Sequence, residues 1–169
     1  MQMKRLIALL CTAMTLLCCL TACGGESSEK IIEYADMKAL AEKMVAADSS
    51  FPDMLIATDA DENAQENFAS VSQMDYTKIA HYLIAYSSEG KADEVVVIAV
   101  KDKNEVLAAK AALDTHVITR KNMYRTYDPS QEPRVAAAKV FVSGYYAVLI
   151  VSDHADAVQA AFDGGSAAE

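Results

Sequence analysis

The sequence predicts an α+β fold in which two antiparallel β-hairpins form one sheet packed by helices, in the order α-ββ-α-ββ-α. Two observations favour this class. Short apolar runs occur in pairs that are separated by turn residues, as in hairpins. The segments around these pairs repeat apolar residues every three or four positions, which is the spacing of an amphipathic helix. We expect the helices to cover one face of the sheet.

The first predicted helix spans 36–48, with Asp36 as its N-cap. Apolar residues follow at helical spacing: Met37, Leu40, Ala41, Met44 and Val45. Residues 49–75 are less regular, because they contain Pro52 and a polar stretch at 59–67. This part predicts a loop with short extended pieces.

The first predicted hairpin joins strands at 79–87 and 94–101. The earlier segment fits a helix as well as a strand, and we favour a strand because the turn residues at 87–90 follow it. The later segment is apolar almost throughout, which indicates a strand at the centre of its sheet.

A long helix is predicted next, because Asp102 and Glu105 resemble a capping box and an apolar face continues to about Arg125. Asp128 and Pro129 end it.

The remaining segments are a short helix at 130–137, a second hairpin and a last helix. The hairpin pairs 139–142 with 145–151 around Ser143 and Gly144, since glycine permits the positive φ of a tight turn. Asp153 is the expected N-cap of the last helix.

Residues 1–22 have the three parts of a secretory signal peptide. Lys4 and Arg5 precede an apolar run from Leu6 to Leu20, and small residues follow it. The run has about 15 residues, which is shorter than the ~20 that cross a bilayer as a helix. We therefore expect export and removal of this segment.

The residues Leu20-Thr21-Ala22-Cys23 resemble the bacterial lipobox. This resemblance implies cleavage between Ala22 and Cys23 and a diacylglyceryl group joined to the Cys23 thiol through a thioether. Its acyl chains, such as palmitate, hold the protein on the outer face of the cell membrane. An ordinary cleaved signal peptide or a buried cysteine are the alternatives. The expected organisation is a lipidated cysteine and flexible tether at 23–33, a single domain at 34–163 and a disordered tail at 164–169.

Charge and cysteine content narrow the function classes. Removal of Lys4 and Arg5 with the signal changes the formal net charge from −9 to −11, since 13 basic residues then face 24 acidic ones. Nucleic acid is excluded as a partner, because binding it depends on Lys and Arg.

The chain has four cysteines, of which Cys11, Cys18 and Cys19 lie in the signal peptide and only Cys23 remains after its removal. No disulfide framework is therefore expected within the mature monomer.

The chain also resembles a family of uncharacterised small lipoproteins, classified as a domain of unknown function, from Gram-positive, clostridial-type bacteria. The resemblance rests on the lipobox, the strand 94–101 with Asp102 after it, Tyr124 and Tyr127, and the hairpin 142–152. It covers about 36–162. It implies a location and a fold, and it supplies no catalytic residue.

The sequence contains no catalytic motif that we can assign. His81, His116 and His154 have no metal-ligand spacing, and Ser143 lacks the glycine of a nucleophile elbow. We therefore expect neither an enzyme nor a cofactor.

One stretch partly resembles a calcium loop. Asp59, Asp61 and Asn63 match its positions 1, 3 and 5, but Ala64 replaces the glycine of position 6 and Ser70 replaces the bidentate glutamate of position 12. We therefore predict a solvated acidic loop and no metal, with these residues as a weak cation-site candidate.

Tyrosines give the candidate interaction surface, because exposed tyrosine is common at protein interfaces. The four candidates are Tyr124, Tyr127, Tyr145 and Tyr146. The leading hypothesis is a non-enzymatic protein-interaction module that binds an extracytoplasmic protein and is tethered to the membrane through Cys23. The alternative is a small-ligand or cation-binding lipoprotein for transport or sensing.

Overall fold

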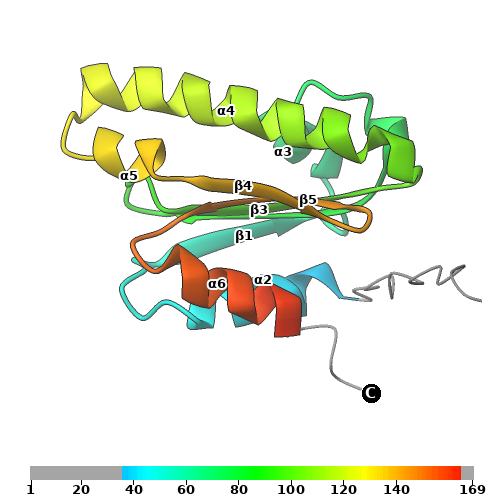
Figure 1. Ribbon diagram of the computed structural model, residues 1–169, viewed down its shortest axis with the longest axis horizontal. Helices are drawn as coiled ribbons and strands as arrows, with labels where there is room; N and C mark the ends of the chain where they lie inside the picture. Colours follow the sequence, from blue (N-terminus) through cyan, green and yellow to red (C-terminus); the bar gives the residue numbers. More distant parts are fainter. Residues whose placement is uncertain (1–35, 165–169) are drawn as a thin grey trace, which may run out of the picture. The chain divides into compact units, whose positions relative to one another are not determined.

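The computed structural model describes residues 36–164 and confirms a mixed α+β fold (Figure 1). Two single 3₁₀ turns lie at Tyr76–Lys78 and Lys103–Glu105. The helices and strands in chain order are α2 (Met37–Ala46), β1 (Met54–Thr58), α3 (Ala64–Ala69), β2 (Ile79–Ser87), β3 (Glu94–Val100), α4 (Val106–Tyr127), α5 (Glu132–Ala136), β4 (Lys139–Ser143), β5 (Tyr146–Val151) and α6 (Ala155–Asp163).

All five strands form one antiparallel sheet in the order β1-β2-β3-β5-β4. The two predicted hairpins, β2–β3 and β4–β5, join through the pairing of β3 with β5. The central position expected for 94–101 is confirmed, because β3 has neighbours on both sides and all seven of its residues are buried.

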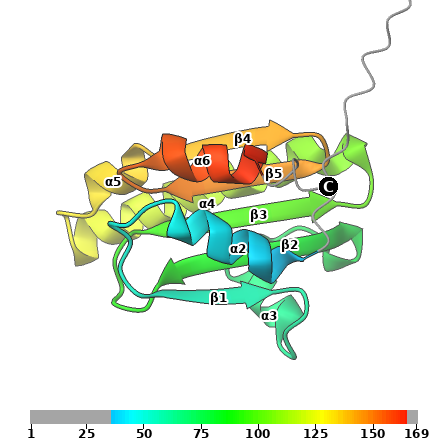
Figure 2. The same ribbon diagram turned by 90° about the horizontal axis from the view of Figure 1, so that it is seen from below.

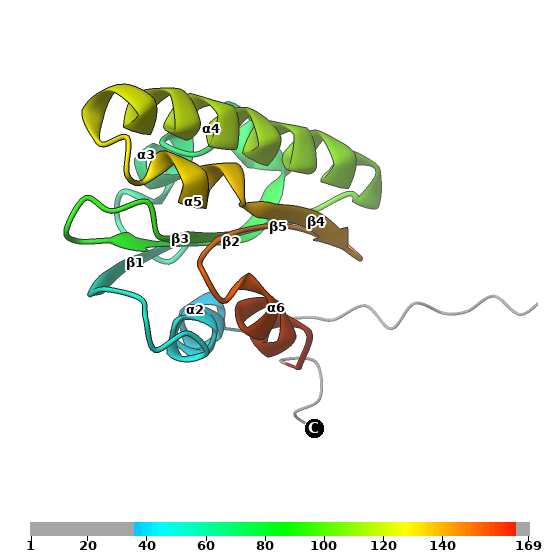
Figure 3. The same ribbon diagram turned by 60° about the vertical axis from the view of Figure 1, so that its left-hand side comes forward.

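Helices cover both faces of the sheet, so the expectation of one covered face is wrong. Figure 3 shows α3, α4 and α5 on one side and α2 and α6 on the other. Seen from below in Figure 2, α2 lies over the β1–β3 part of the sheet and α6 over β5. The reason is the composition of β3 and β5, which are apolar at successive positions and therefore expose two apolar faces that both need cover.

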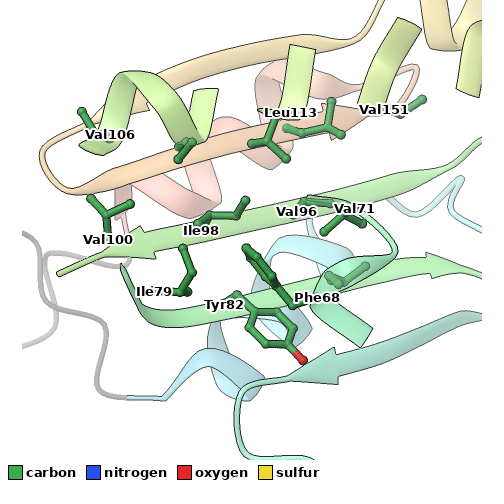
Figure 4. Close-up of a cluster of buried hydrophobic side chains, with 14 of the residues drawn as sticks. Phe68, Val71, Ile79, Tyr82, Val96, Ile98, Val100, Val106, Leu113 and Val151 are labelled. Carbon is green, nitrogen blue, oxygen red and sulfur yellow. The ribbon is translucent and has the colours of Figure 1, made fainter. Parts of the chain in front are cut away.

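Each face has its own hydrophobic core. The core under α4 contains Phe68, Tyr82, Ile98 and Leu113, and its side chains interdigitate between helix and strands (Figure 4). The Tyr82 hydroxyl donates a 2.7 Å hydrogen bond to the Ala64 carbonyl, which satisfies its polar end inside this core.

The opposite core lies between the sheet and the α2–α6 layer. It contains Met44, Val97, Tyr146 and Phe162. The rings of Tyr146 and Phe162 meet edge to face with centroids 6.0 Å apart.

Two elements occur where a loop with short extended pieces was predicted, namely β1 and α3. The strand β1 is only five residues long and pairs with β2 alone. The helix α3 has six residues, of which Ala64 and Phe68 are buried. Both are too short for periodicity to reveal, and tertiary contacts stabilise them.

Three predictions about caps and turns are wrong. Asp102 caps the 3₁₀ turn Lys103–Glu105 and forms no capping box with Glu105. The Glu105 carboxylate instead accepts a 2.8 Å hydrogen bond from Lys78. Asp153 does not cap α6, because its carboxylate pairs with Arg134. The hairpin turn is Gly144–Tyr145 rather than Ser143–Gly144.

In contrast, the Asp36 cap of α2 is confirmed, since its side chain accepts a 3.0 Å bond from the Ala39 N–H.

No helix within residues 36–164 is long and apolar enough to cross a membrane. The predicted signal peptide 1–22, the Cys23 lipidation site, the tether 23–33 and residues 165–169 of the predicted tail lie outside the described residues.

Candidate functional site

A groove runs between α3, the segment after it and α4. It consists of two hollows of about 480 and 390 Å³ that are open to solvent. Both are lined by Ser70, Val71 and His116, so they are adjacent. We call this feature the α3–α4 groove.

Glu94 lies at the base of the larger hollow. It is the first residue of β3 and alternates with Val96 and Ile98, whose side chains pack in the core under α4. Its side chain is only 3% exposed. A carboxylate in such a place requires charged or hydrogen-bonding partners, because burial without them is costly.

Two side chains from α4 supply these partners. His116 Nε2 lies 3.1 and 3.0 Å from the two oxygens of Glu94. Arg120 approaches the same carboxylate with Nε 3.3 Å from Oε2 and Nη1 3.4 Å from Oε1. Because Arg120 is always charged, it neutralises Glu94 without requiring a protonated histidine.

Tyr124 extends this cluster by one more helical turn. The Arg120 guanidinium lies 5.3 Å from the Tyr124 ring centroid, and the Tyr124 hydroxyl donates a 3.0 Å bond to the Gly90 carbonyl. Burial raises the pKa of Tyr124, so its hydroxyl keeps the proton that it donates. His116, Arg120 and Tyr124 follow each other at four-residue spacing, which places them on one side of α4. With Glu94 they form what we call the Glu94 cluster.

The wall opposite α4 is polar. Asn63, Glu66, Asn67 and Ser70 line the larger hollow and share one side of α3 and its ends by their spacing. The sheet contributes Ala57, Ile84 and Tyr86. Tyr86 pairs across the strands with Leu55, and these two side chains are 40% and 50% exposed.

A second charged group, which includes the buried carboxylate of Asp93, joins the start of β3 to α5. Arg134 Nη1 lies 2.5 Å from Asp93 Oδ1, and its Nη2 bonds the Asp153 carboxylate. Gln131 accepts a 3.1 Å bond from the Ala92 N–H. This group lines neither hollow of the groove and fixes α5 against the β2–β3 turn and the β5–α6 junction.

A third polar group, the Asp48 clasp, joins the end of α2 to the end of β5. The Ser152 hydroxyl donates a 2.5 Å bond to Asp48 Oδ2, and Ser50 donates from its hydroxyl at 2.6 Å and its N–H at 2.8 Å to Oδ1. Burial acts to raise the pKa of Asp48, but these hydrogen bonds and nearby His154 outweigh it, so the pKa is lowered.

The four predicted interface tyrosines do not form one surface. Tyr124 is buried and bonds Gly90 just before β3, whereas the Tyr145 carbonyl accepts a 3.0 Å bond from Val100 at the end of β3. Tyr124 and Tyr145 therefore lie near opposite ends of β3. Tyr146 is buried in the core on the α2–α6 side, and Tyr127 is 78% exposed.

The residues of the calcium-like stretch close the turn after β1. Asp59 Oδ2 lies 2.8 Å from His81 Nδ1, and its Oδ1 accepts a 3.1 Å bond from the Tyr82 N–H. Asp61 accepts a 2.9 Å bond from the Thr58 N–H. Asn63 precedes α3 and makes no side-chain cap bond. Within residues 36–164, no group of three His, Cys, Asp or Glu side chains is arranged to hold a metal ion.

Sequence reasoning missed the Glu94 cluster. The side chains of His81 and His116 contact carboxylates, and His154 lies near Asp48. Of the three, only His116 lines the groove, and none of them belongs to a catalytic or metal-ligand motif. A usable signal was present: the four-residue spacing of His116, Arg120 and Tyr124, together with an acidic residue at the start of an apolar strand.

Comparisons with known proteins add a family assignment. No curated protein and no solved structure matches the chain. Residues 48–152 match the family described as Domain of unknown function (DUF4358). This segment begins and ends at the two outer residues of the Asp48 clasp and includes the whole Glu94 cluster. Because the match covers more than half of the 169 residues, the chain belongs to the DUF4358 family.

Proposed function

We propose that this protein is a lipid-anchored extracytoplasmic lipoprotein and that its domain is a non-enzymatic protein-interaction module. The α3–α4 groove is the proposed contact site. The observation that carries this choice is the Glu94 cluster, which places buried charged groups at the base of an open groove.

The state of these groups favours binding over catalysis. His116 and Arg120 each contact the Glu94 carboxylate, and Arg120 also donates a 3.1 Å hydrogen bond to the Ala92 carbonyl. Such groups are held in place before a partner arrives, which lowers the entropy lost on binding. The charged groups that a reaction would require are already paired in this cluster. We therefore assign Glu94, His116 and Arg120 to shaping the groove.

The proposed location rests on the N-terminal sequence. A signal peptide, the lipobox-like residues ending at Cys23 and a polar tether support export and anchoring. A net charge of −11 for the chain after residue 22, from 13 basic and 24 acidic residues, supports a domain that anionic headgroups repel.

A photo-crosslinking amino acid tests the contact site in intact cells. Placed at Ser70, on the groove, it is expected to capture a discrete protein on illumination. The matched control is Ala111, which is exposed on α4 and lines neither hollow. Equal capture from both positions, or none from Ser70, argues against the groove as the contact site.

A small-ligand function is the second candidate, and the size of the larger hollow favours it. Its volume of about 480 Å³ lies within the range of ligand pockets, ~300–1,000 Å³. A screen of thermal unfolding with amino acids, sugars and divalent cations tests this version. A concentration-dependent rise in Tm that Arg120→Met abolishes is the expected result if this candidate is correct.

A further inference from the structure

We infer that the α3–α4 groove takes an extended polypeptide segment that carries an apolar side chain and, two residues away, a basic one. This inference rests on the proposed interaction function and specifies the chemistry of the partner. Three features of the groove lead to it: its two unlike compartments, the fact that they adjoin, and their charge.

The smaller hollow is the more apolar compartment. Val71, Met74 and Ala112 line it, and no Asp, Glu, Lys or Arg side chain is among its lining residues. Burial of one aliphatic side chain here removes apolar surface from water and so would stabilise a complex.

The larger hollow is the charged compartment. It contains Glu66 on the α3 wall, Glu94 and Arg120 at its base, and Tyr86 at its edge. Because Arg120 pairs with Glu94, Glu66 contributes an additional negative charge, and Glu66 forms no ion pair among residues 36–164.

The free carboxylate and the nearby ring favour a cation. Tyr86 is 40% exposed and lines the same hollow as Glu66, so its aromatic ring can contact a basic group that Glu66 attracts. The net charge of the whole domain acts in the same direction, because it repels acidic segments and attracts basic ones.

The two compartments adjoin each other. Ser70, Val71 and His116 line both hollows, so one short chain segment can reach both of them. Side chains at alternate positions of an extended segment are about 6.6–6.8 Å apart and point to the same side. One segment therefore places its first side chain against Met74 and its third against Glu66, while the second faces solvent.

Fluorescence anisotropy with full-length protein in detergent tests the inference. The probe is a labelled heptapeptide, Thr-Thr-Leu-Thr-Lys-Thr-Thr, and the comparison peptide has Glu in place of Lys. We expect saturable binding of the Lys peptide and at least tenfold weaker binding of the Glu peptide. Glu66→Lys should reverse this preference.

Glu62→Lys is the matched control, because Glu62 is an exposed acidic residue near the start of α3 that lines neither hollow. It makes the same charge change and should leave the preference for the Lys peptide intact. Equal binding of the two peptides overturns the inference, as does an equal effect of both substitutions. If Ser70 still captures a protein in cells while neither peptide binds, the interaction function stands and the peptide chemistry is wrong.

Discussion

At the scale of single residues, the buried charge of Glu94 dominates the candidate site. Replacement by Gln leaves the Arg120 guanidinium largely buried without its counter-charge. We expect Glu94→Gln to lower the free energy of unfolding by about 3 kcal/mol, since removal of one partner of a buried ion pair leaves an uncompensated charge. Urea unfolding followed by circular dichroism measures this loss.

The double variant Glu94→Gln/Arg120→Met separates charge from packing. It removes both charges, so it should recover most of the stability that Glu94→Gln loses. If the double variant is less stable than Glu94→Gln alone, the uncompensated charge of Arg120 is not the cause of the loss of stability.

Asp48 provides a prediction about pH at the same scale. Its pKa is lowered in the folded state, so the proton binds more tightly to the unfolded chain. The stabilisation is fully present above the ordinary aspartate pKa and is lost as pH falls through the lower folded value. We expect the wild type to lose stability below about pH 4.

Asp48→Asn should weaken that acid dependence, because an amide does not titrate. Unfolding free energies measured from pH 6 to pH 3 for both proteins provide the check. Parallel pH curves for the variant and the wild type would show that Asp48 is not a source of the acid sensitivity.

At the scale of elements, α4 both packs on the sheet and lines the groove. Val106, Ala109 and Leu113 pack in the core, and His116 and Arg120 extend the same helix into the groove. The geometry of the groove is therefore tied to the packing of α4 on the sheet. Substitutions in this part of the core are expected to change binding as well as stability.

The turn between β4 and β5 is a second feature at this scale. Gly144 has φ +58°, and a Cβ built there meets nothing within 4 Å. Gly144→Ala should therefore cost about 1 kcal/mol through backbone strain alone. Thermal unfolding measures this effect.

Gly164→Ala is the control, because Gly164 has φ −78° and the nearest contact of an added Cβ is Lys43 Nζ at 3.9 Å. The control should be nearly neutral. A similar fall in Tm for both variants would mean that positive φ does not determine the turn.

At the scale of the whole molecule, the fold separates the groove from the N-terminal entry to the domain. The described residues begin with α2 on one face of the sheet, whereas α3 and α4, which line the groove, lie on the other face (Figure 3).

The anchor itself is tested by Cys23→Ser. Without the thiol no thioether to a diacylglyceryl group forms, so the variant should leave the detergent-rich phase on partitioning and appear in the aqueous phase. Retention of the variant with membranes at the wild-type level would contradict lipidation at Cys23.

Much of the fold was predictable from local signals. The strands 79–87 and 94–101, the long helix, the Asp36 cap and the second hairpin all follow from periodicity and turn chemistry within short windows. The charge balance and the lipobox resemblance likewise depend only on the order of residues, and they provide the expectation about location.

Only the tertiary structure determines which residues form the candidate site. Glu94 lies 22 residues before His116 and 26 before Arg120, and only the packing of α4 over β3 brings these side chains into contact. The same holds for Asp48 and Ser152, which are 104 residues apart. The short elements β1 and α3 and the cover on both faces also depend on long-range burial. Local sequence sets which elements form, whereas the pairing of distant charges is fixed by how the two apolar faces of the sheet are covered.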